Sequence, residues 1–310
     1  MIMNPVQVSA PATTANLGPG FDCLGMALEL WNQVEVLPPS TSEGDPLVEV
    51  SGEGEGELPT DGSNLVYRAM EFLFQEADEA LPPMRLRCHN QIPVKRGLGS
   101  SAAAIAGGLA AANALCSHNF SSEELLEMAA TMEGHPDNVA AAVLGGLRLV
   151  VIDEKQLYTV PINIPWEVHA VLFVPEFGIS TADARRVLPE KISIADAVHN
   201  AARTALLVAG MLTNHPEYLP IATQDRLHQP YRQSLFPAMK AIFAAARAAG
   251  ALGVFLSGSG PTILAFTQGR EMTVAYEMAE AARQAGVEGK IHITRPAAKG
   301  AHVVDKHRRI

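Results

Sequence analysis

Gly97-Leu98-Gly99-Ser100-Ser101, followed by the small-residue run 102–109, is the stretch that decides the fold of this chain. Glycine has no Cβ and adopts positive φ readily, so backbone N–H groups on such a turn can converge on one point. A helix that begins directly behind the turn adds its unsatisfied first-turn donors and the positive end of its dipole. These features predict a phosphate-binding loop, with two serine hydroxyls available to phosphate or to bound Mg²⁺.

Other interpretations of the same stretch are less consistent with its surroundings. A tight turn that serves only close helix packing has the same pattern, because short glycine motifs are common. A Walker A loop is excluded, since no Gly-Lys-Ser/Thr follows at the required spacing. The stretch matches the loose dinucleotide form Gly-x-Gly-x-x-Ala, ending at Ala102, but the expected acidic residue about 20 positions on is missing. Residues 117–124 there predict a helix start instead.

The composition sets limits on domain number and partners. A chain of 310 residues predicts about two domains. The net charge of −10 argues against a nucleic-acid partner, which needs a basic face. Cys23, Cys88 and Cys116 form no zinc pattern, and an odd count argues against a disulfide framework. No apolar run is long enough for a membrane span, and residues 1–5 lack the start of a secretion signal, so we expect a soluble cytoplasmic protein with no membrane partner.

Hydrophobic periodicity predicts an α+β chain. In the first half it predicts strands over 6–10, 23–30, 33–37, 47–50, 84–90 and 147–152, and helices over 64–80, 100–116, 121–134 and 136–145. The second half reads β-α-α-β-β-α-β, with strands over 168–174, 253–256, 262–266 and 290–294 and longer helices over 193–213, 235–249 and 271–285. The proline-bounded segment 161–165 predicts a boundary between an N-terminal domain, 1–163, and a C-terminal domain, 164–310.

Several polar residues could meet a small ligand near the glycine loop, and each also has a purely structural interpretation. Asn16 and Asp22 lie in a turn-rich loop, where Asx-turns are the commoner role and anchoring of a polar ligand is the alternative. Glu127 lies on the helix predicted over 121–134, where most glutamates are only solvated. The run 135–138 (His-Pro-Asp-Asn) starts a new helix with three hydrogen-bonding side chains, which suit either capping or a polar substrate.

Three glycine-bearing stretches, 11–25, 93–104 and 257–262, follow one another in an order that resembles the GHMP small-molecule kinase superfamily. The central stretch is similar to the family signature Pro-x-x-x-Gly-Leu-Gly-Ser-Ser-Ala, and the last to its Gly-Ser-Gly-Pro motif. The first stretch and the segment 133–139 (Glu-Gly-His-Pro-Asp-Asn-Val) resemble homoserine kinases in particular. Motif order and length match over essentially the whole chain.

The resemblance implies a two-domain fold. The N-terminal domain would contain a left-handed β-α-β crossover and bind ATP, and the C-terminal domain would be ferredoxin-like. The active site would lie in the cleft between the two domains. The implied activity is ATP-dependent phosphorylation of L-homoserine to O-phospho-L-homoserine, the step before threonine synthesis, and family analogy suggests a homodimer.

The resemblance also implies roles for single residues. Residues implied to bind ATP are Asn64, Pro93, Lys95, Arg96, Gly97, Leu98, Gly99, Ser100, Ser101 and Ala102. Residues implied to bind homoserine are Asn16, Asp22, His135, Asn138, Arg185, Arg232 and Gly260, with Asp22 suited to the ammonium and the two arginines to the carboxylate. The implied Mg²⁺ ligands are Ser100 and Glu127, and the implied catalytic residues are Asn138, Ser100 and Glu127.

One position departs from part of the superfamily. Relatives similar to mevalonate kinase carry an aspartate, proposed as the base, where this chain has Asn138. An asparagine amide cannot take a proton at neutral pH, so a conventional catalytic base is in doubt and transfer by positioning and charge stabilisation is expected. Two alternatives stay open here: a kinase of another small alcohol such as mevalonate, and a non-catalytic regulatory member that only binds ligand.

Overall fold

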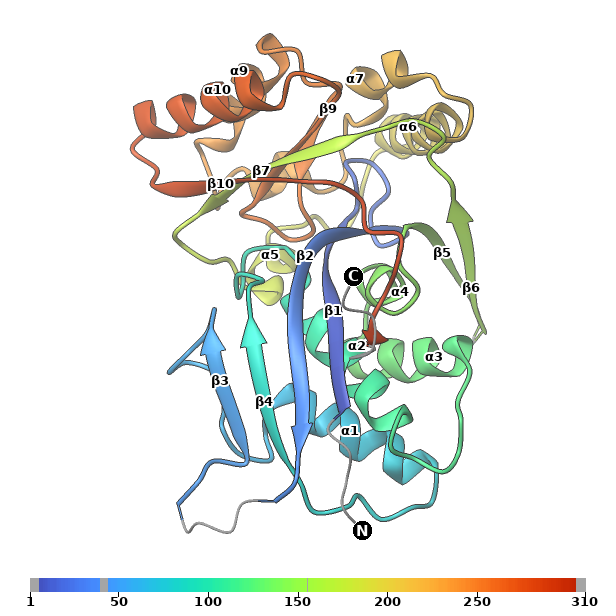
Figure 1. The fold of residues 1–310 in the computed structure, drawn as a ribbon. Helices are drawn as coiled ribbons and strands as arrows, with labels where there is room; N and C mark the ends of the chain where they lie inside the picture. The colour runs from blue at the N-terminus through green and yellow to red at the C-terminus, as the bar shows by residue number, and fades with distance from the viewer. Residues whose placement is uncertain (1–5, 40–43, 155, 305–310) are drawn as a thin grey trace.

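The computed structural model describes residues 6–39, 44–154 and 156–304, which form two β-sheets covered by helices (Figure 1). The prediction about a secretion signal in residues 1–5 lies outside the described residues. The first sheet contains β1 (Val6–Ala15), β2 (Leu24–Leu37), β3 (Val48–Gly52), β4 (Arg85–Asn90), β5 (Leu147–Asp153), β6 (Gln156–Ile162) and β11 (His302–Val303). The second contains β7 (His169–Pro175), β8 (Gly253–Leu256), β9 (Ile263–Thr267) and β10 (Gly289–Thr294).

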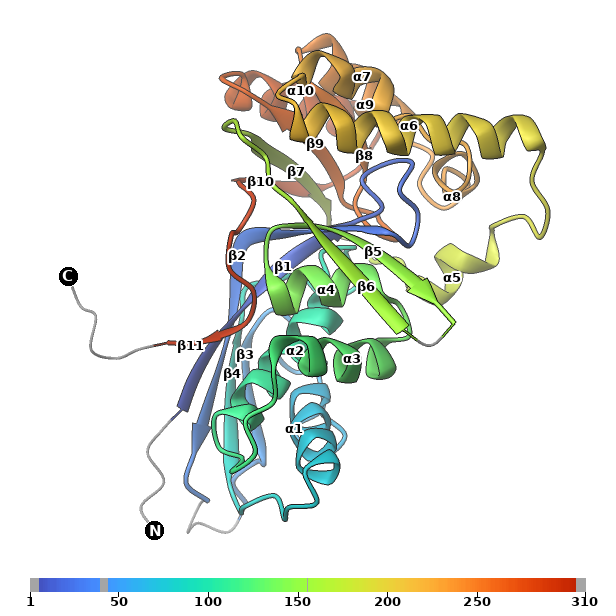
Figure 2. The same ribbon diagram turned by 90° about the vertical axis from the view of Figure 1, so that its right-hand side faces the viewer.

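The helices divide between the two sheets. Four of them cover one face of the first sheet (Figure 2): α1 (Leu65–Glu76), α2 (Ser100–Asn113), α3 (Ser122–Glu133) and α4 (Pro136–Leu144). The others follow β7 in sequence: α5 (Thr181–Arg186), α6 (Ile194–Leu212), the short 3₁₀ helix η1 (Pro216–Tyr218), α7 (Leu219–Ala222), α8 (Gln229–Arg232), α9 (Met239–Ala248) and α10 (Glu271–Gln284). Within the described ranges, no helix has the length and apolar character needed to cross a membrane.

The strand order confirms the predicted fold class. In the first sheet the order is β11-β1-β2-β4-β3, with β5 beside β2 and β6 beside β5. β3 and β4 are parallel and are joined through α1, whereas the other described pairs are antiparallel. The second sheet has the order β10-β7-β9-β8, the arrangement of a ferredoxin-like β-α-β-β-α-β unit. We keep the division at residues 163 and 164 as a proposal; it lies between β6 and β7, where the chain passes to the second sheet.

The helix pairs pack closely because the sequence supplies small residues at the contacts. A Cβ on Gly108 in α2 would lie 2.5 Å from the carbonyl oxygen of Val66 in α1, so only glycine allows this approach. The shared hydrophobic cluster beneath the glycine loop includes Leu98 from the loop and Phe255 and Phe266 from the second sheet. The loops of both halves are therefore anchored on one core, and their relative positions are fixed by packing.

The end of the described chain returns to the first sheet. We call residues 295–304 the C-terminal strap (Figure 2). The N–H of Ala297 donates to the carbonyl of Ala27 in β2 (2.9 Å), and the N–H of Ala301 donates to the carbonyl of Ala142 in α4 (2.7 Å). The strap therefore links the C-terminal part of α4 to β2 in the first sheet.

Three strands of the first sheet differ from the prediction. β1 continues to Ala15, although a loop was expected from residue 12, because the polar Thr13 and Thr14 find buried hydrogen-bond partners there. β2 is one continuous strand rather than two. β6 was not predicted, since its side chains are mostly exposed and Pro161 masks the pattern; it is an edge strand, where proline is tolerated.

Candidate active site

The glycine loop has the geometry of an anion site. Gly97 and Gly99 both have positive φ, 75° and 65°, and a Cβ on Gly97 would lie 2.3 Å from the carbonyl oxygen of Ser257. A Cβ on Gly99 would lie 1.8 Å from Oγ1 of Thr13. α2 begins directly at Ser100, and no side chain caps its N-terminus. Among the residues that the structure describes, no side chain caps the first turn of α2, so its N–H groups are available to a ligand.

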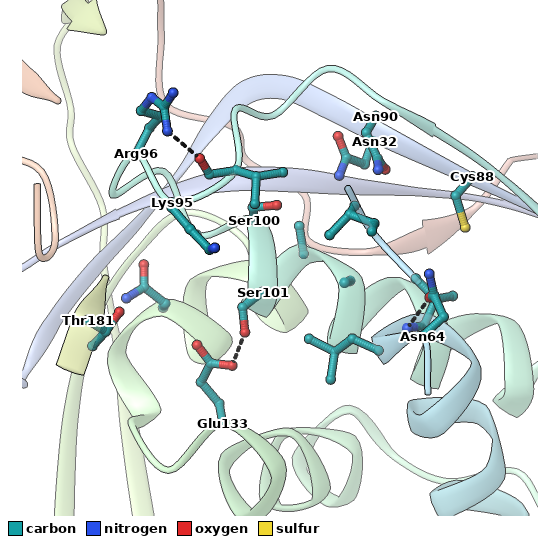
Figure 3. Close-up of a pocket in the computed structure, with 18 of the residues that line it drawn as sticks. Asn32, Asn64, Cys88, Asn90, Lys95, Arg96, Ser100, Ser101, Glu133 and Thr181 are labelled. Carbon is teal, nitrogen blue, oxygen red and sulfur yellow. Dashed lines mark hydrogen bonds between the residues drawn. The ribbon is translucent and has the colours of Figure 1, made fainter. Parts of the chain in front are cut away.

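A cavity of about 370 Å³ opens in front of this loop (Figure 3). One part of it is lined by apolar side chains together with Asn64, Cys88 and Asn90, and the other part by Lys95, the two loop serines and Glu133. An apolar slot that ends at a phosphate-binding loop has the polarity of a nucleotide, with a base at one end and phosphates at the other.

Most residues expected to bind ATP line this cavity: Asn64, Lys95, Arg96, Gly97, Gly99, Ser100 and Ser101. Pro93, Leu98 and Ala102 do not, because their side chains are buried in the protein. Asn64 caps α1 by accepting a hydrogen bond from the N–H of Val66 at 3.0 Å. Arg96 is tied down by the carbonyl groups of Pro175 (2.9 Å), Val94 (2.9 Å) and Glu176, so it links the loop to the end of β7.

The structure places the expected metal ligand Glu127 away from the cavity and another glutamate of the same helix, Glu133, at it. Glu127 is exposed and does not line the cavity, whereas Glu133 lines it and accepts a hydrogen bond from the hydroxyl of Ser101 (Figure 3). Six residues of helix rotate the side-chain direction by about 240°, so the two glutamates of α3 point to different sides. Burial raises the pKa of Glu133, and the bond from Ser101 opposes that shift.

No group of three or more His, Cys, Asp or Glu side chains forms a metal cage within the described ranges. Glu133 also has no cationic partner among the residues that the structure describes. An unpaired carboxylate beside serine hydroxyls and an anion site is a donor set that suits a cation shared with phosphate oxygens. The residues present therefore fit Mg²⁺ bound together with a nucleotide, rather than in an all-protein site.

A second cluster, of charged residues, lies near the start of α4. The guanidinium of Arg185 forms two hydrogen bonds with the carboxylate of Asp22, at 2.7 and 3.1 Å. Arg185 and Arg232 both lie over the ring of Phe21, with its centroid 5.4 and 5.5 Å from the two guanidinium carbons. Arg232 is 3% exposed, and burial lowers its pKa to about 10, so it stays protonated at neutral pH.

His135 and Asn138 connect the charged cluster to the cavity. His135 is the N-cap residue of α4, and burial followed by the charge of Arg185 lowers its pKa, which places it within the electrostatic reach of the cluster. Asn138 lines the cavity, and its Oδ1 accepts a hydrogen bond from the hydroxyl of Thr13 at 2.8 Å. The structure thus brings Asp22, His135, Asn138 and the arginines together around one end of α4.

Asn16 and Gly260 lie near this cluster, and their contacts in the structure connect loops to one another. The amide of Asn16 donates to the carbonyl of Gly258 (2.9 Å) and accepts from the N–H of Asp22 (3.0 Å). Gly260 has φ 86° and packs against Gly97, since a Cβ on Gly97 would lie 2.9 Å from its nitrogen. These contacts orient Asp22 and close the loop 257–260 over the glycine turn.

Asp137 is buried beneath the same helix end. It is 3% exposed, and its Oδ1 accepts a hydrogen bond from the N–H of Asn138 at 2.8 Å. Burial raises its pKa to about 6. The carboxylate therefore bonds to the backbone of the next residue and does not line the cavity.

Four residues that were not expected from the sequence line the cavity or contact the expected site residues: Thr13, Phe21, Glu133 and His228. Thr13 and Phe21 belong to the first glycine-bearing stretch, and Glu133 opens the segment 133–139, so their motif positions were the available signal. His228 lies four residues before Arg232, and no sequence pattern singled it out.

Comparisons with known proteins agree with this geometry. Residues 64–146 match the family model of the GHMP kinases N terminal domain, and residues 204–287 match that of the GHMP kinases C terminal. The homoserine kinase of Moorella thermoacetica is 44% identical over 297 residues, which cover 96% of this chain and 99% of that protein. A homoserine kinase of Synechocystis is also 44% identical, over 96% of this chain and 97% of that protein.

Solved structures show the same similarity. The crystal structure of homoserine kinase from Cytophaga hutchinsonii superposes with a TM-score of 0.87 at 29% identity, and the match covers 98% of each chain. L. major mevalonate kinase superposes with a TM-score of 0.69 at 15% identity, covering 93% of this chain and 95% of that one. The second likeness shows a shared fold alone.

Proposed function

This chain belongs to the GHMP kinase family, and we infer from that membership and from its likeness to homoserine kinases that it phosphorylates the hydroxyl of L-homoserine with ATP. The protein is an enzyme, a phosphotransferase with an alcohol group as acceptor. The observation that carries the choice of substrate is the cluster of Asp22, Arg185 and Arg232 beside the glycine loop. A carboxylate suits the ammonium of an amino acid, and guanidinium groups suit its carboxylate, whereas mevalonate has no ammonium.

The glycine loop is proposed to bind the phosphates of ATP. The free N–H groups at the start of α2 and the helix dipole provide donors and a partial positive charge. The side chain of Lys95 extends into the same cavity toward Ser101 (Figure 3). The apolar slot near Asn64 then receives the adenine, because stacking on apolar surface needs no charged partner.

Mg²⁺ is proposed as the cofactor, held by Glu133 and the hydroxyls of Ser100 and Ser101. Carboxylate and hydroxyl oxygens are the donors that Mg²⁺ prefers, and Glu133 is the carboxylate of this chain that lines the described cavity. When bound, the ion would neutralise part of the charge on the phosphate oxygens.

Transfer is proposed to depend on positioning rather than on a side-chain base. Asn138 lies between the cavity and the charged cluster, where its amide can hold the acceptor hydroxyl in line with the γ-phosphate. Asp137 bonds to the N–H of Asn138, so we assign it to orienting that residue. Backbone N–H groups of the loop would stabilise the charge that develops on the transferring group.

The test is ADP release with Mg-ATP against a panel of homoserine, serine, threonine, mevalonate and galactose. Release with homoserine alone is expected. Release with mevalonate alone would keep the phosphate-loop assignment and overturn the roles of Asp22, Arg185 and Arg232. ATP binding without release on any substrate would favour a regulatory member of the family.

The setting of the reaction is proposed on the same basis. Phosphorylation activates the hydroxyl of homoserine for the next step of threonine synthesis, and we propose the cytoplasm as the compartment of that chemistry. A homodimer is proposed by family analogy, and sedimentation of the purified protein tests it.

A further inference from the structure

Arg232, which the proposed function assigns to the substrate carboxylate, is fixed by several acceptors inside the protein. Its Nε donates to the carbonyl of Ala184 (3.2 Å), and its Nη1 donates to the carbonyl of Gly258 (2.8 Å) and to Nδ1 of His228 (3.0 Å). Its Nη2 has no hydrogen-bond partner in the described part of the chain. A carboxylate therefore meets a guanidinium whose orientation the protein has already set.

His228 holds a defined tautomer. A guanidinium has donors and no acceptor, so the bond from Arg232 requires Nδ1 of His228 to be unprotonated. The proton of the neutral ring then lies on Nε2, which is 2.7 Å from the carbonyl oxygen of Gly18 and donates to it. The side chain is fully buried, and burial lowers its pKa to about 4, in agreement with a neutral ring.

Asp225 fixes the backbone that carries His228. Its carboxylate accepts hydrogen bonds from the N–H groups of Leu227 (2.8 Å), His228 (3.1 Å) and Gln229 (2.7 Å), so it organises the start of α8. The amide of Asn200 donates to the same carboxylate at 2.7 Å. These bonds leave the histidine ring little freedom to turn away from Arg232.

The ring of His228 also stacks on Phe21, with centroids 5.2 Å apart and planes inclined by 26°. The guanidinium groups of Arg185 and Arg232 both lie over the ring of Phe21 as well. His228 thus contacts the loop that carries Asp22, through Gly18 and Phe21, and contacts Arg232 directly. It is the one described side chain that bonds both to this loop and to Arg232.

We propose that His228 is a positioning residue for carboxylate recognition, because its Nδ1 orients the guanidinium of Arg232 while its Nε2–H anchors the loop at Gly18. The proposal rests on the proposed function, since it assumes that Arg232 binds the carboxylate of homoserine. The two ring nitrogens have separate tasks, and two conservative substitutions separate them.

His228→Asn and His228→Gln form a matched pair. The Oδ1 of asparagine can replace Nδ1 as the acceptor for Arg232, and the amide N–H of glutamine can replace Nε2–H as the donor to Gly18. Both remain neutral, and both lose the stacking on Phe21. Each variant is assayed with Mg-ATP on L-homoserine and on propanolamine, which has the hydroxyl and the ammonium but no carboxylate.

His228→Gln is expected to raise the KM for homoserine about tenfold, the loss of one hydrogen bond to a charged group. Its kcat and its KM for ATP should stay near those of the native enzyme, and its preference for homoserine over propanolamine should fall by the same factor. His228→Asn keeps the acceptor for Arg232 and loses the donor to Gly18, so its preference for homoserine over propanolamine should stay close to native while its KM values for the two substrates rise by a common factor. Equal preferences in the two variants, or an unchanged preference in His228→Gln, would overturn the proposal.

A measurement on the native protein covers the case in which both variants fail to fold. Nitrogen shifts of ring-labelled histidines should show one residue with a protonated Nε2 and an unprotonated Nδ1 throughout the neutral range. A protonated Nδ1 at His228 would overturn the proposal, because it cannot accept from Arg232. Native enzyme that does not phosphorylate homoserine would instead refute the proposed function, independently of the tautomer.

Discussion

Replacement of Glu133 by glutamine tests the corrected metal assignment. Glutamine has nearly the same shape, and its carbonyl oxygen can still accept the hydrogen bond that the hydroxyl of Ser101 donates to Glu133. The substitution therefore removes the negative charge and leaves the local packing intact. Glu127→Gln is the matched control, because Glu127 is exposed on the same helix and does not line the cavity.

The expected effect of Glu133→Gln on kcat follows from the loss of the negative charge of Glu133 at the cavity. Loss of one preorganised stabilising group typically costs ~3 kcal/mol of barrier, which lowers kcat on the order of 10²–10³-fold. The free energy of unfolding of Glu133→Gln, in contrast to its kcat, should rise or stay unchanged. Because burial raises the pKa of Glu133, folding disfavours its ionised form, and the neutral glutamine avoids that cost.

The assay is ADP release at increasing Mg²⁺ concentration, with thermal unfolding measured on the same preparations. We expect Glu133→Gln to lose kcat and to need more Mg²⁺ for half of its maximal rate, with an unchanged or higher Tm. Glu127→Gln should behave like the native enzyme. If Glu133→Gln turned over as fast as native protein, or if Glu127→Gln lost as much activity, the metal assignment would be refuted.

Three further pairs of measurements test the loop, the substrate cluster and the buried aspartate. Gly97→Ala should cost ~1–3 kcal/mol more than Gly56→Ala in denaturant unfolding, because both glycines have φ 75° and only Gly97 would place a Cβ against backbone. Arg185→Ala should raise the KM for homoserine about 10–100-fold, because it removes the guanidinium that pairs with Asp22. Arg186→Ala removes only an exposed arginine that pairs with Asp183 on the same helix, and should leave the KM unchanged. Asp137→Asn should have the same free energy of unfolding relative to native protein at every pH below 3.8, and should gain on the order of 3 kcal/mol of stability over native protein as pH rises from 3.8 to about 6. The reason is that the native folded state favours the protonated carboxyl of Asp137. Equal Tm curves for the two proteins from acid to neutral pH would contradict this prediction.

Much of the fold was predictable because its local signals agree with its long-range packing. A capping box of Ser121 and Glu124 begins α3, within the helix predicted over 121–134, and Pro136 lies in the first turn of α4, the helix predicted over 136–145. Where the signals conflict, the sequence misleads. Thr13 and Thr14 look like loop residues, and only the facing backbone and hydroxyl groups of distant segments make a strand of them.

The site was predictable where motif and geometry coincide. The general rule that a glycine turn before a helix binds anions was enough to predict an anion site at Gly97, Gly99 and the loop serines. Glu127 was expected at the site but does not line the cavity, because it and Glu133 lie on different faces of α3 and Glu133 is on the face toward the cavity. His228 could not be found at all, since its partners at Gly18 and Arg232 come from segments that meet only in the folded chain.

The C-terminal strap has a consequence for how the protein is made. A ribosome releases residues in order, so the segment 295–304 emerges after every residue that lines the nucleotide cavity. Until then, the carbonyl groups of Ala27 and Ala142 lack the partners that they have in the finished fold. The helix that carries Asn138 is therefore secured after the cavity-lining residues have been made, and we expect nascent chains to gain catalytic activity only once residues 295–304 have emerged.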